Sequence, residues 1–280
     1  MSFEQGESSF LDVPGAHLYY EKLGTGPVLV LVSGANGEHS IWAPLRQLIK
    51  DHFTVITYDR RGFSQSNLDG EQDYEHRLDT DADDLRRLIE HVTDTPAFVL
   101  GSSSGAIVTL ALLQKHADSV KMAVVHEPPL SKLLPDADKW IPFFHDVYDT
   151  YKQSGIPAAV EKFTSILKNG PEVTTMKKML SEPASEQAKQ NIIYWFEHEF
   201  LPYTLYTPNI DAVKRSSDKI ILCIGEKSKG EFPSWPPQEL ANLLSKSIFY
   251  IPGGHLGYVF EADGFASGLI KALNTQQTDL

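Results

Sequence analysis

Cysteine and positive charge are both scarce in this sequence, and each shortage excludes a class of protein. Cys223 is the one cysteine among 280 residues, so an intrachain disulfide is excluded and no cysteine metal site is indicated. Lys and Arg number 25 against 37 Asp and Glu. The resulting net charge of −12 argues against nucleic acid or an anionic membrane as a partner.

Long apolar runs and targeting signals are also missing. No apolar stretch approaches the roughly 20 residues that a membrane span needs. The first residues, Met1 to Gln5, include no basic region followed by an apolar segment, so no signal peptide is evident. We therefore expect a cytoplasmic protein without a membrane partner. Its length suits one large α/β domain, or one domain that carries an insertion.

Strands and helices alternate along most of the chain, and no internal repeat is present. Runs of Val, Ile and Leu are typical of parallel strands that are covered on both faces. They predict strands at residues 17–21, 28–32, 54–58, 97–100, 121–125, 220–224 and 248–251. Helical segments between these runs indicate a doubly wound, mostly parallel α/β sheet.

The region from about residue 130 to 211 breaks this alternation. It has no convincing buried strand and indicates short helices, interrupted by prolines at 135, 142, 157, 171 and 202 and by Gly155 and Gly170. We expect a helical cap (lid) at 131–211, inserted into a core domain of residues 1–130 and 212–280. Most aromatic residues of the cap should pack inside it. A few, with Trp195 as our candidate, should face a substrate pocket.

The segment from Ala97 to Val108 carries the strongest functional signal. A short apolar strand meets the motif GSSSG at residues 101–105, and an apolar helix follows at once. A Gly-x-Ser-x-Gly turn between strand and helix holds its central serine in strained geometry above the sheet. We therefore expect Ser103 to be a nucleophile. The backbone N–H of Ser104, unpaired at the helix start, should bind an oxyanion.

A serine hydroxyl needs a base to act as a nucleophile at neutral pH, and the base needs a group that orients it. His255 lies in a glycine-rich loop directly after the last predicted strand, at the sheet edge where ligands bind in open α/β folds. A second oxyanion donor should come from the loop after the strand at 28–32, where small residues let the backbone approach a substrate. We choose Ala35 as this donor, and Gly34 and Asn36 as substrate-binding neighbours.

These motifs, in this order, resemble those of the α/β-hydrolase superfamily over nearly the whole chain. A further match is the turn at residues 59–66 (DRRGFSQS), similar to the family's Asp-x-Arg-Gly-x-Gly-x-Ser with Ser64 in place of a glycine. The resemblance implies an eight-stranded sheet with the helical cap inserted after the sixth strand. Residues 101–106 (GSSSGA) and 125–129 (VHEPP) are also similar to the zearalenone-lactonase-like group and to bacterial relatives of unassigned substrate.

The motifs leave the position of the catalytic acid open. Most members of the superfamily carry it in the loop after the strand at 220–224, where this chain offers Glu226. The lactonase-like group carries it at the end of the preceding core strand, where Glu127 stands. We favour Glu127, and expect the prolines at 128 and 129 to keep it extended with its carboxylate at the sheet edge. His126 should face the other side of the strand and serve packing.

The sequence therefore predicts a serine hydrolase for a small-molecule ester or lactone, with Ser103, His255 and Glu127 as catalytic residues and with no metal or organic cofactor. Alternatives are carbon–carbon bond hydrolysis or cofactor-free peroxidation on the same residues, and a ligand receptor of this fold with little turnover. A phosphate-binding loop is disfavoured, because the turn has neither Gly-x-Gly-x-x-Gly nor Gly-Lys-Ser/Thr. The substrate and the oligomeric state stay open, with a homodimer as one alternative.

Overall fold

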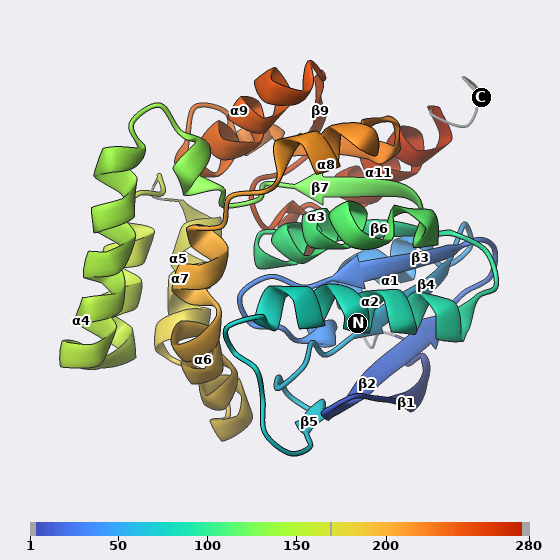
Figure 1. Ribbon diagram of the computed structural model, residues 1–280, viewed down its shortest axis with the longest axis horizontal. Helices are drawn as coiled ribbons and strands as arrows, with labels where there is room; N and C mark the ends of the chain where they lie inside the picture. The colour runs from blue at the N-terminus through green and yellow to red at the C-terminus, as the bar shows by residue number, and fades with distance from the viewer. Residues whose placement is uncertain (1–3, 169, 276–280) are drawn as a thin grey trace.

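A mostly parallel sheet lies at the centre of the computed structural model, which describes residues 4–168 and 170–275 (Figure 1). In that part of the chain the sheet has nine strands, in the order β1-β2-β4-β3-β6-β7-β8-β9 with β5 paired to β2. The strands are β1 (Glu7–Val13), β2 (Ala16–Leu23), β3 (Val28–Val32), β4 (Thr54–Tyr58), β5 (Asn67–Leu68), β6 (Ala97–Ser102), β7 (Val120–His126), β8 (Ile220–Gly225) and β9 (Ile248–Ile251).

Parallel pairing extends from β4 through β3, β6, β7 and β8 to β9. β2 pairs antiparallel with β1, β4 and β5. All residues of β6 and β8 are buried, because helices cover both faces of these parallel strands. Every strand expected from the sequence is present, which confirms the doubly wound sheet with eight strands on its main path. The sequence missed β1, an edge strand whose residues are mostly exposed, and the two-residue β5.

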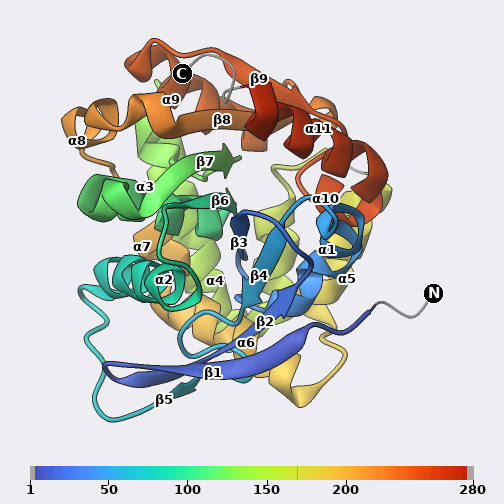
Figure 2. The ribbon, with the colours of Figure 1, turned by 90° about the vertical axis from the view of Figure 1, so that its right-hand side faces the viewer.

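Helices cover the sheet on its two faces (Figure 2). Successive residues of a strand point to opposite faces. Leu29 and Leu31 of β3 accordingly pack in one cluster with residues of α1 (Ala43–Ile49) and α11 (Ala262–Thr275). Val30 and Val32 pack in another, with α2 (Arg77–Val92), α3 (Ser104–His116) and α9 (Trp235–Leu244). The short helices α8 (Ile210–Arg215) and α10 (Gly257–Phe260) complete the two layers, beside α3 and α11.

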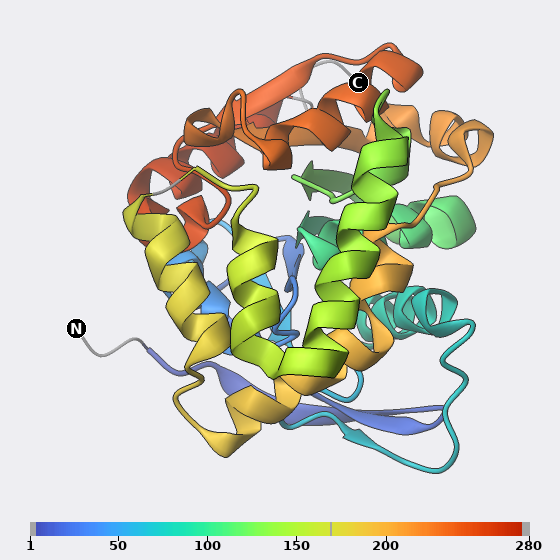
Figure 3. The same cartoon turned by 90° about the vertical axis from the view of Figure 1, so that its left-hand side faces the viewer.

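Four further helices stand beyond the carboxyl ends of the central strands (Figure 3). These cap helices are α4 (Ala137–Thr164), α5 (Pro171–Ser181), α6 (Glu186–His198) and α7 (Phe200–Thr204). They follow β7, the sixth strand of the main path, as the family resemblance implies. The division into domains at 131–211 stays a prediction, and α8 crosses its C-terminal boundary. No helix of the described residues combines the length and the apolarity needed to cross a membrane.

The longest cap helix differs from the sequence prediction at its prolines. α4 continues through Pro142, where the sequence predicts a break. Pro142 is past the first turn of α4, so its missing N–H costs one backbone hydrogen bond, and the helix nevertheless continues through it. The break expected near Pro157 is present, but Gly155 makes it: its φ of 79° and ψ of −179° interrupt the helix. Pro171 begins α5 at the first helical position, where a missing N–H is of no consequence.

A buried ion-pair network connects the cap helices to the core. Glu199, between α6 and α7, has no exposed surface and accepts hydrogen bonds from both terminal nitrogens of Arg60, each 2.7 Å long. Arg77 of α2 donates to the same carboxylate at 2.7 Å. Asp81, 3.2 Å from Arg60, accepts a hydrogen bond from the Tyr203 hydroxyl of α7. Because unpaired charges are strongly unfavourable in a protein interior, these groups are stable only while cap and core are joined.

Removal of the Glu199 charge should therefore destabilise the protein. Glu199→Gln keeps the shape of the side chain but leaves two buried arginines beside a neutral amide. We expect the free energy of unfolding to fall by about 3–5 kcal/mol, measured by urea denaturation with circular dichroism. The matched control is Glu197→Gln on α6, whose carboxylate pairs with the half-exposed Lys152. It should cost less than about 1 kcal/mol, and equal losses in the two variants would contradict the assignment.

Candidate active site

A sharp turn joins β6 to α3 and carries Ser103. Its φ of 56° and ψ of −122° are values that residues with a side chain rarely adopt. Two glycines leave the necessary room. A Cβ on Gly105 would collide with the carbonyl oxygen of Val32, and one on Gly101 would collide with that of Gly105. The Ser103 N–H donates to the His126 carbonyl at 3.0 Å and so fixes the turn to β7. The predicted strand, turn and helix are confirmed.

The three consecutive serines have different surroundings. Ser102 is fully buried, and its Oγ lies 2.9 Å from Nδ1 of His126. Ser104 is buried at the first position of α3, where backbone N–H groups have no partner within the helix. Ser103 is the partly exposed member of the group, and it lines a cavity beneath the cap helices. The fold therefore brings the hydroxyl of Ser103, and not that of Ser102, to the cavity.

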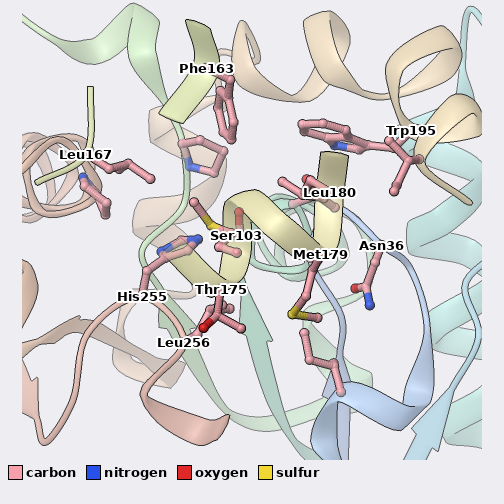
Figure 4. Close-up of a pocket in the computed structure, with 18 of the residues that line it drawn as sticks. Asn36, Ser103, Phe163, Leu167, Thr175, Met179, Leu180, Trp195, His255 and Leu256 are labelled. Atoms are coloured by element: carbon pink, nitrogen blue, oxygen red, sulfur yellow. The ribbon is translucent and has the colours of Figure 1, made fainter. Parts of the chain in front are cut away.

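His255 lines the same cavity as Ser103 (Figure 4). Its Nδ1 is 2.6 Å from Oε2 of Glu127. The other oxygen of that carboxylate accepts the Gly225 N–H at 2.8 Å. Glu127 is 1% exposed, whereas Glu226 faces solvent. Of the two acids that the sequence left open, the structure brings Glu127 to the histidine.

The backbone of Glu127 is not extended, and the sequence prediction on this point is wrong. Its φ of 47° lies in the left-handed region. The Glu127 N–H still pairs with β8, through the Cys223 carbonyl at 3.1 Å. An extended residue would continue the alternation of β7 and point its side chain away from that of His126. The left-handed turn instead directs the carboxylate toward the end of β8, where the Gly225 N–H meets it.

Burial, hydrogen bonding and neighbouring charges together shift the pKa values of Glu127, His126 and His255. Burial alone would raise the pKa of Glu127, but the adjacent His126 and the hydrogen bond from His255 lower it to about 2. Burial lowers the pKa of His126 to about 4, so that ring is neutral at pH 7. Burial disfavours protonated His255 too, but the hydrogen bond and charge of Glu127 raise its pKa above the usual value. Of the two histidines, His255 is therefore the one whose protonated form the site favours.

His126 and Ser228 support the site in ways that the sequence did not show. His126 is fully buried, as expected of a packing residue, but its ring centroid lies 6.2 Å from that of His255. Its Nε2 is 3.9 Å from Oε1 of Glu127. Ser228 stands near the place where most members of the superfamily carry their acid, and its buried hydroxyl helps to lower the pKa of Glu127. Both residues lie within two positions of a candidate acid, Glu127 or Glu226, but no local pattern in the sequence predicts that they reach the site.

The loop after β3 approaches Ser103 closely. A Cβ on Gly34 would lie 3.1 Å from the Cβ of Ser103. The Gly34 carbonyl accepts a hydrogen bond from Nη2 of Arg60 at 2.8 Å. A trans peptide points the next N–H opposite to its carbonyl, and the described residues include no cis peptide. The Ala35 N–H therefore points away from Arg60.

A cavity of about 430 Å³ lies under the cap helices, and every site residue expected from the sequence lines it (Figure 4). They are Ser103, His255, Glu127, Ala35, Ser104, Gly34, Asn36 and Trp195. The rest of the wall is largely apolar and comes mainly from the cap helices, with Phe144, Phe163, Met179 and Ile192 as examples. The arrangement can hold an apolar molecule against a serine and a carboxylate–imidazole pair.

Sequence comparisons agree with this architecture. The family model for the alpha/beta hydrolase fold matches residues 27–262. YraK, an uncharacterized hydrolase of Bacillus subtilis (strain 168), is 32% identical, with 95% of this chain and 96% of that protein covered. A zearalenone hydrolase of Bionectria ochroleuca is 35% identical over a shorter match, which covers 43% of this chain and 46% of that protein.

Solved structures of similar shape include esterases and lactone-degrading enzymes. A thermophilic esterase from Thermogutta terrifontis superposes with a TM-score of 0.72 at 20% identity, over 96% of this chain and 99% of that chain. Est816, an N-acyl homoserine lactone degrading enzyme, gives a TM-score of 0.71 at 18% identity, over 94% and 99%. At identities as low as these, the structural similarity shows a shared fold only. With the family model, the nearly full-length match to YraK and the observed sheet order, it shows that the chain belongs to the α/β-hydrolase fold family.

Proposed function

We propose that this protein is a serine hydrolase that cleaves a carboxylic ester or a lactone through an acyl-enzyme intermediate. One observation carries the proposal. A strained, partly exposed Ser103 shares a cavity with His255, whose Nδ1 lies 2.6 Å from the buried Glu127 carboxylate. A serine nucleophile needs both a base and a group that orients the base.

In the proposed reaction, Oγ of Ser103 attacks the substrate carbonyl carbon and Nε2 of His255 accepts the hydroxyl proton. Nδ1 is engaged by Glu127, which leaves Nε2 for the serine and stabilises the imidazolium. The N–H groups of Ala35 and Ser104 donate to the oxyanion. Collapse of the intermediate breaks the bond between the carbonyl carbon and the alkoxy oxygen, which takes the proton from His255, and the acyl group stays on Ser103; the alcohol departs from an ester and remains attached in a lactone. Water, deprotonated by His255, then releases the acid and restores the serine.

The cavity favours a bulky and mainly apolar substrate. Its volume of about 430 Å³ and its wall of aromatic and thioether side chains, such as Trp195 and Met179, suit a ligand with a large hydrocarbon surface. Asn36, in the loop after β3, offers a polar group to the cavity. The zearalenone hydrolases that resemble part of this chain support a lactone as one substrate class to test.

Covalent labelling tests the nucleophile. Ser103→Ala should lose its reaction with a fluorophosphonate probe, because the probe bonds to a serine that a histidine activates. Ser102→Ala is the matched control and should keep the label, since the Ser102 hydroxyl is buried against His126. In-gel fluorescence measures both. A label that survives in Ser103→Ala would assign the reactivity to another residue.

Turnover separates an enzyme from a receptor of this fold. A wild type that is labelled but hydrolyses no p-nitrophenyl ester, aryl ester or macrolactone would favour a receptor.

Substitution of the two acids tests the triad. Glu127→Gln should lower kcat by about 10³- to 10⁴-fold, because an amide can neither hold His255 in the required tautomer nor stabilise its charged form. Glu226→Gln changes an exposed side chain and should lower kcat by less than about tenfold, or about 1.4 kcal/mol. Steady-state kinetics on one p-nitrophenyl ester measures both variants. The opposite ranking would move the acid to the loop after β8.

The pH dependence of kcat/KM tests the role of His255. A base must be neutral to accept a proton, and Glu127 raises the pKa of His255 above 6.5. Activity should therefore fall as the pH decreases, with a midpoint above 6.5. The pKa of Glu127, about 2, keeps this carboxylate ionised throughout the transition. A profile with its acid midpoint below 6.5 would contradict the assignment.

A further inference from the structure

Glu172 connects the cap helices to the loop that holds His255. It lies in the first turn of α5, directly after Pro171 at the first helical position. Its Oε1 accepts a hydrogen bond from the backbone N–H of Leu256, the residue after His255. Its Oε2 lies against Gly254, where an added Cβ would collide with it. The carboxylate therefore contacts the loop on both sides of His255.

The same face of α5 forms part of the cavity wall. Thr175, Met176, Met179 and Leu180 line the cavity. They lie three, four, seven and eight positions after Glu172, a spacing that places all of them on one side of a helix. Figure 4 shows Thr175, Met179 and Leu180 at this wall. A substrate in the cavity would thus touch the helix whose first turn holds the histidine loop.

α5 also borders a second cavity, of about 340 Å³, which Glu172 lines. Met176 and His255 line both cavities. Leu167 and Pro233 also line both, so the helix and the imidazole form part of the partition between them. If α5 moved away from the sheet edge, this partition would open and the loop around His255 would lose its contact with Glu172.

The electrostatic surroundings of His255 include this carboxylate. The charges of Glu127 and Glu172 both favour its protonated form and raise its pKa, in opposition to burial. The titratable groups that face His255 or Glu172 from neighbouring elements are Glu127, His126, Lys227 and Tyr258. Lys227 forms an ion pair with Glu261 and also interacts electrostatically with Glu172.

We propose that Glu172 is a positioning residue for His255, so that the catalytic base is in place only while α5 is docked against the sheet edge. The inference rests on the proposed function, in which His255 is the base. In this arrangement the cap helps to position the catalytic base. A substrate that packs against α5 steadies the helix, and through Glu172 it steadies the loop of His255.

Two substitutions separate the hydrogen bond from the charge. Glu172→Ala removes both, and kcat for a p-nitrophenyl ester should fall by roughly ten- to a hundredfold as the base loses its alignment. KM for a small ester should change by less than about threefold, since no substrate contact is removed. Glu172→Gln keeps an acceptor oxygen for the Leu256 N–H and should recover most of the lost kcat. The matched control is Glu186→Ala, which removes an exposed carboxylate from the first turn of α6.

NMR titration of the His255 imidazole adds a readout that does not depend on turnover. Loss of the Glu172 charge should lower the pKa of His255 in both Glu172 variants and leave it unchanged in Glu186→Ala. A folded Glu172→Ala with the kcat and the His255 titration of the wild type would overturn the inference, while the proposed function would stand.

The hydrolase function and the positioning role of Glu172 can be rejected independently of each other. If the wild type hydrolyses no ester or lactone, the proposed function fails, and the NMR titration still decides whether Glu172 acts on His255. If Glu172→Ala does not fold, Glu172→Leu takes its place, because it also removes the acceptor for the Leu256 N–H but keeps more of the side-chain volume. A Glu172→Leu protein with the kcat and the His255 titration of the wild type would overturn the positioning role.

Discussion

The site depends on one buried guanidinium, that of Arg60. It has no exposed surface, and its nitrogens donate to the carbonyls of Ser33 and Gly34, to Asp81 on α2 and to Glu199 in the cap. A charge at this depth is stable only when its donors meet acceptors. Arg60 therefore couples the loop after β3, a helix of the core and the cap. A shift in any one of them leaves the buried guanidinium with unpaired donors, which is unfavourable.

Two residues with left-handed backbones stand at the ends of neighbouring strands. Ser103 follows β6 with a φ of 56°, and Glu127 follows β7 with a φ of 47°. Such conformations are unfavourable by about 1–3 kcal/mol for residues with side chains and persist where the surrounding structure holds them. Here the sheet does so, because each N–H donates to a carbonyl of the next strand, that of His126 and that of Cys223. Strain at these two positions sets the geometry of the site.

Local patterns were enough to predict the parallel strands, the Gly-x-Ser-x-Gly turn and the glycine-rich loop of His255, because each depends on residues close in sequence. The choice of Glu127 required a family resemblance, since its contact with His255 joins residues 128 positions apart. Its left-handed turn and the nearness of His126 to the site could not be predicted, because strand alternation assumes that the strand continues. The pairing of Glu199 with Arg60, across 139 positions, likewise leaves no mark in any periodicity.

The ionic connection at Glu199 also bears on how the substrate cavity can be changed. The cap helices supply most of the apolar cavity wall. Their ionic connection to the core lies elsewhere, where Arg60 and Arg77 donate hydrogen bonds to Glu199. Side chains along the wall can change size without disturbing the sheet edge, provided that α5 keeps its contact with the loop of His255 through Glu172. Substitutions in the cap wall can therefore alter substrate preference, whereas the attachment of the cap to the core depends on an acid, Glu199, that does not line the cavity.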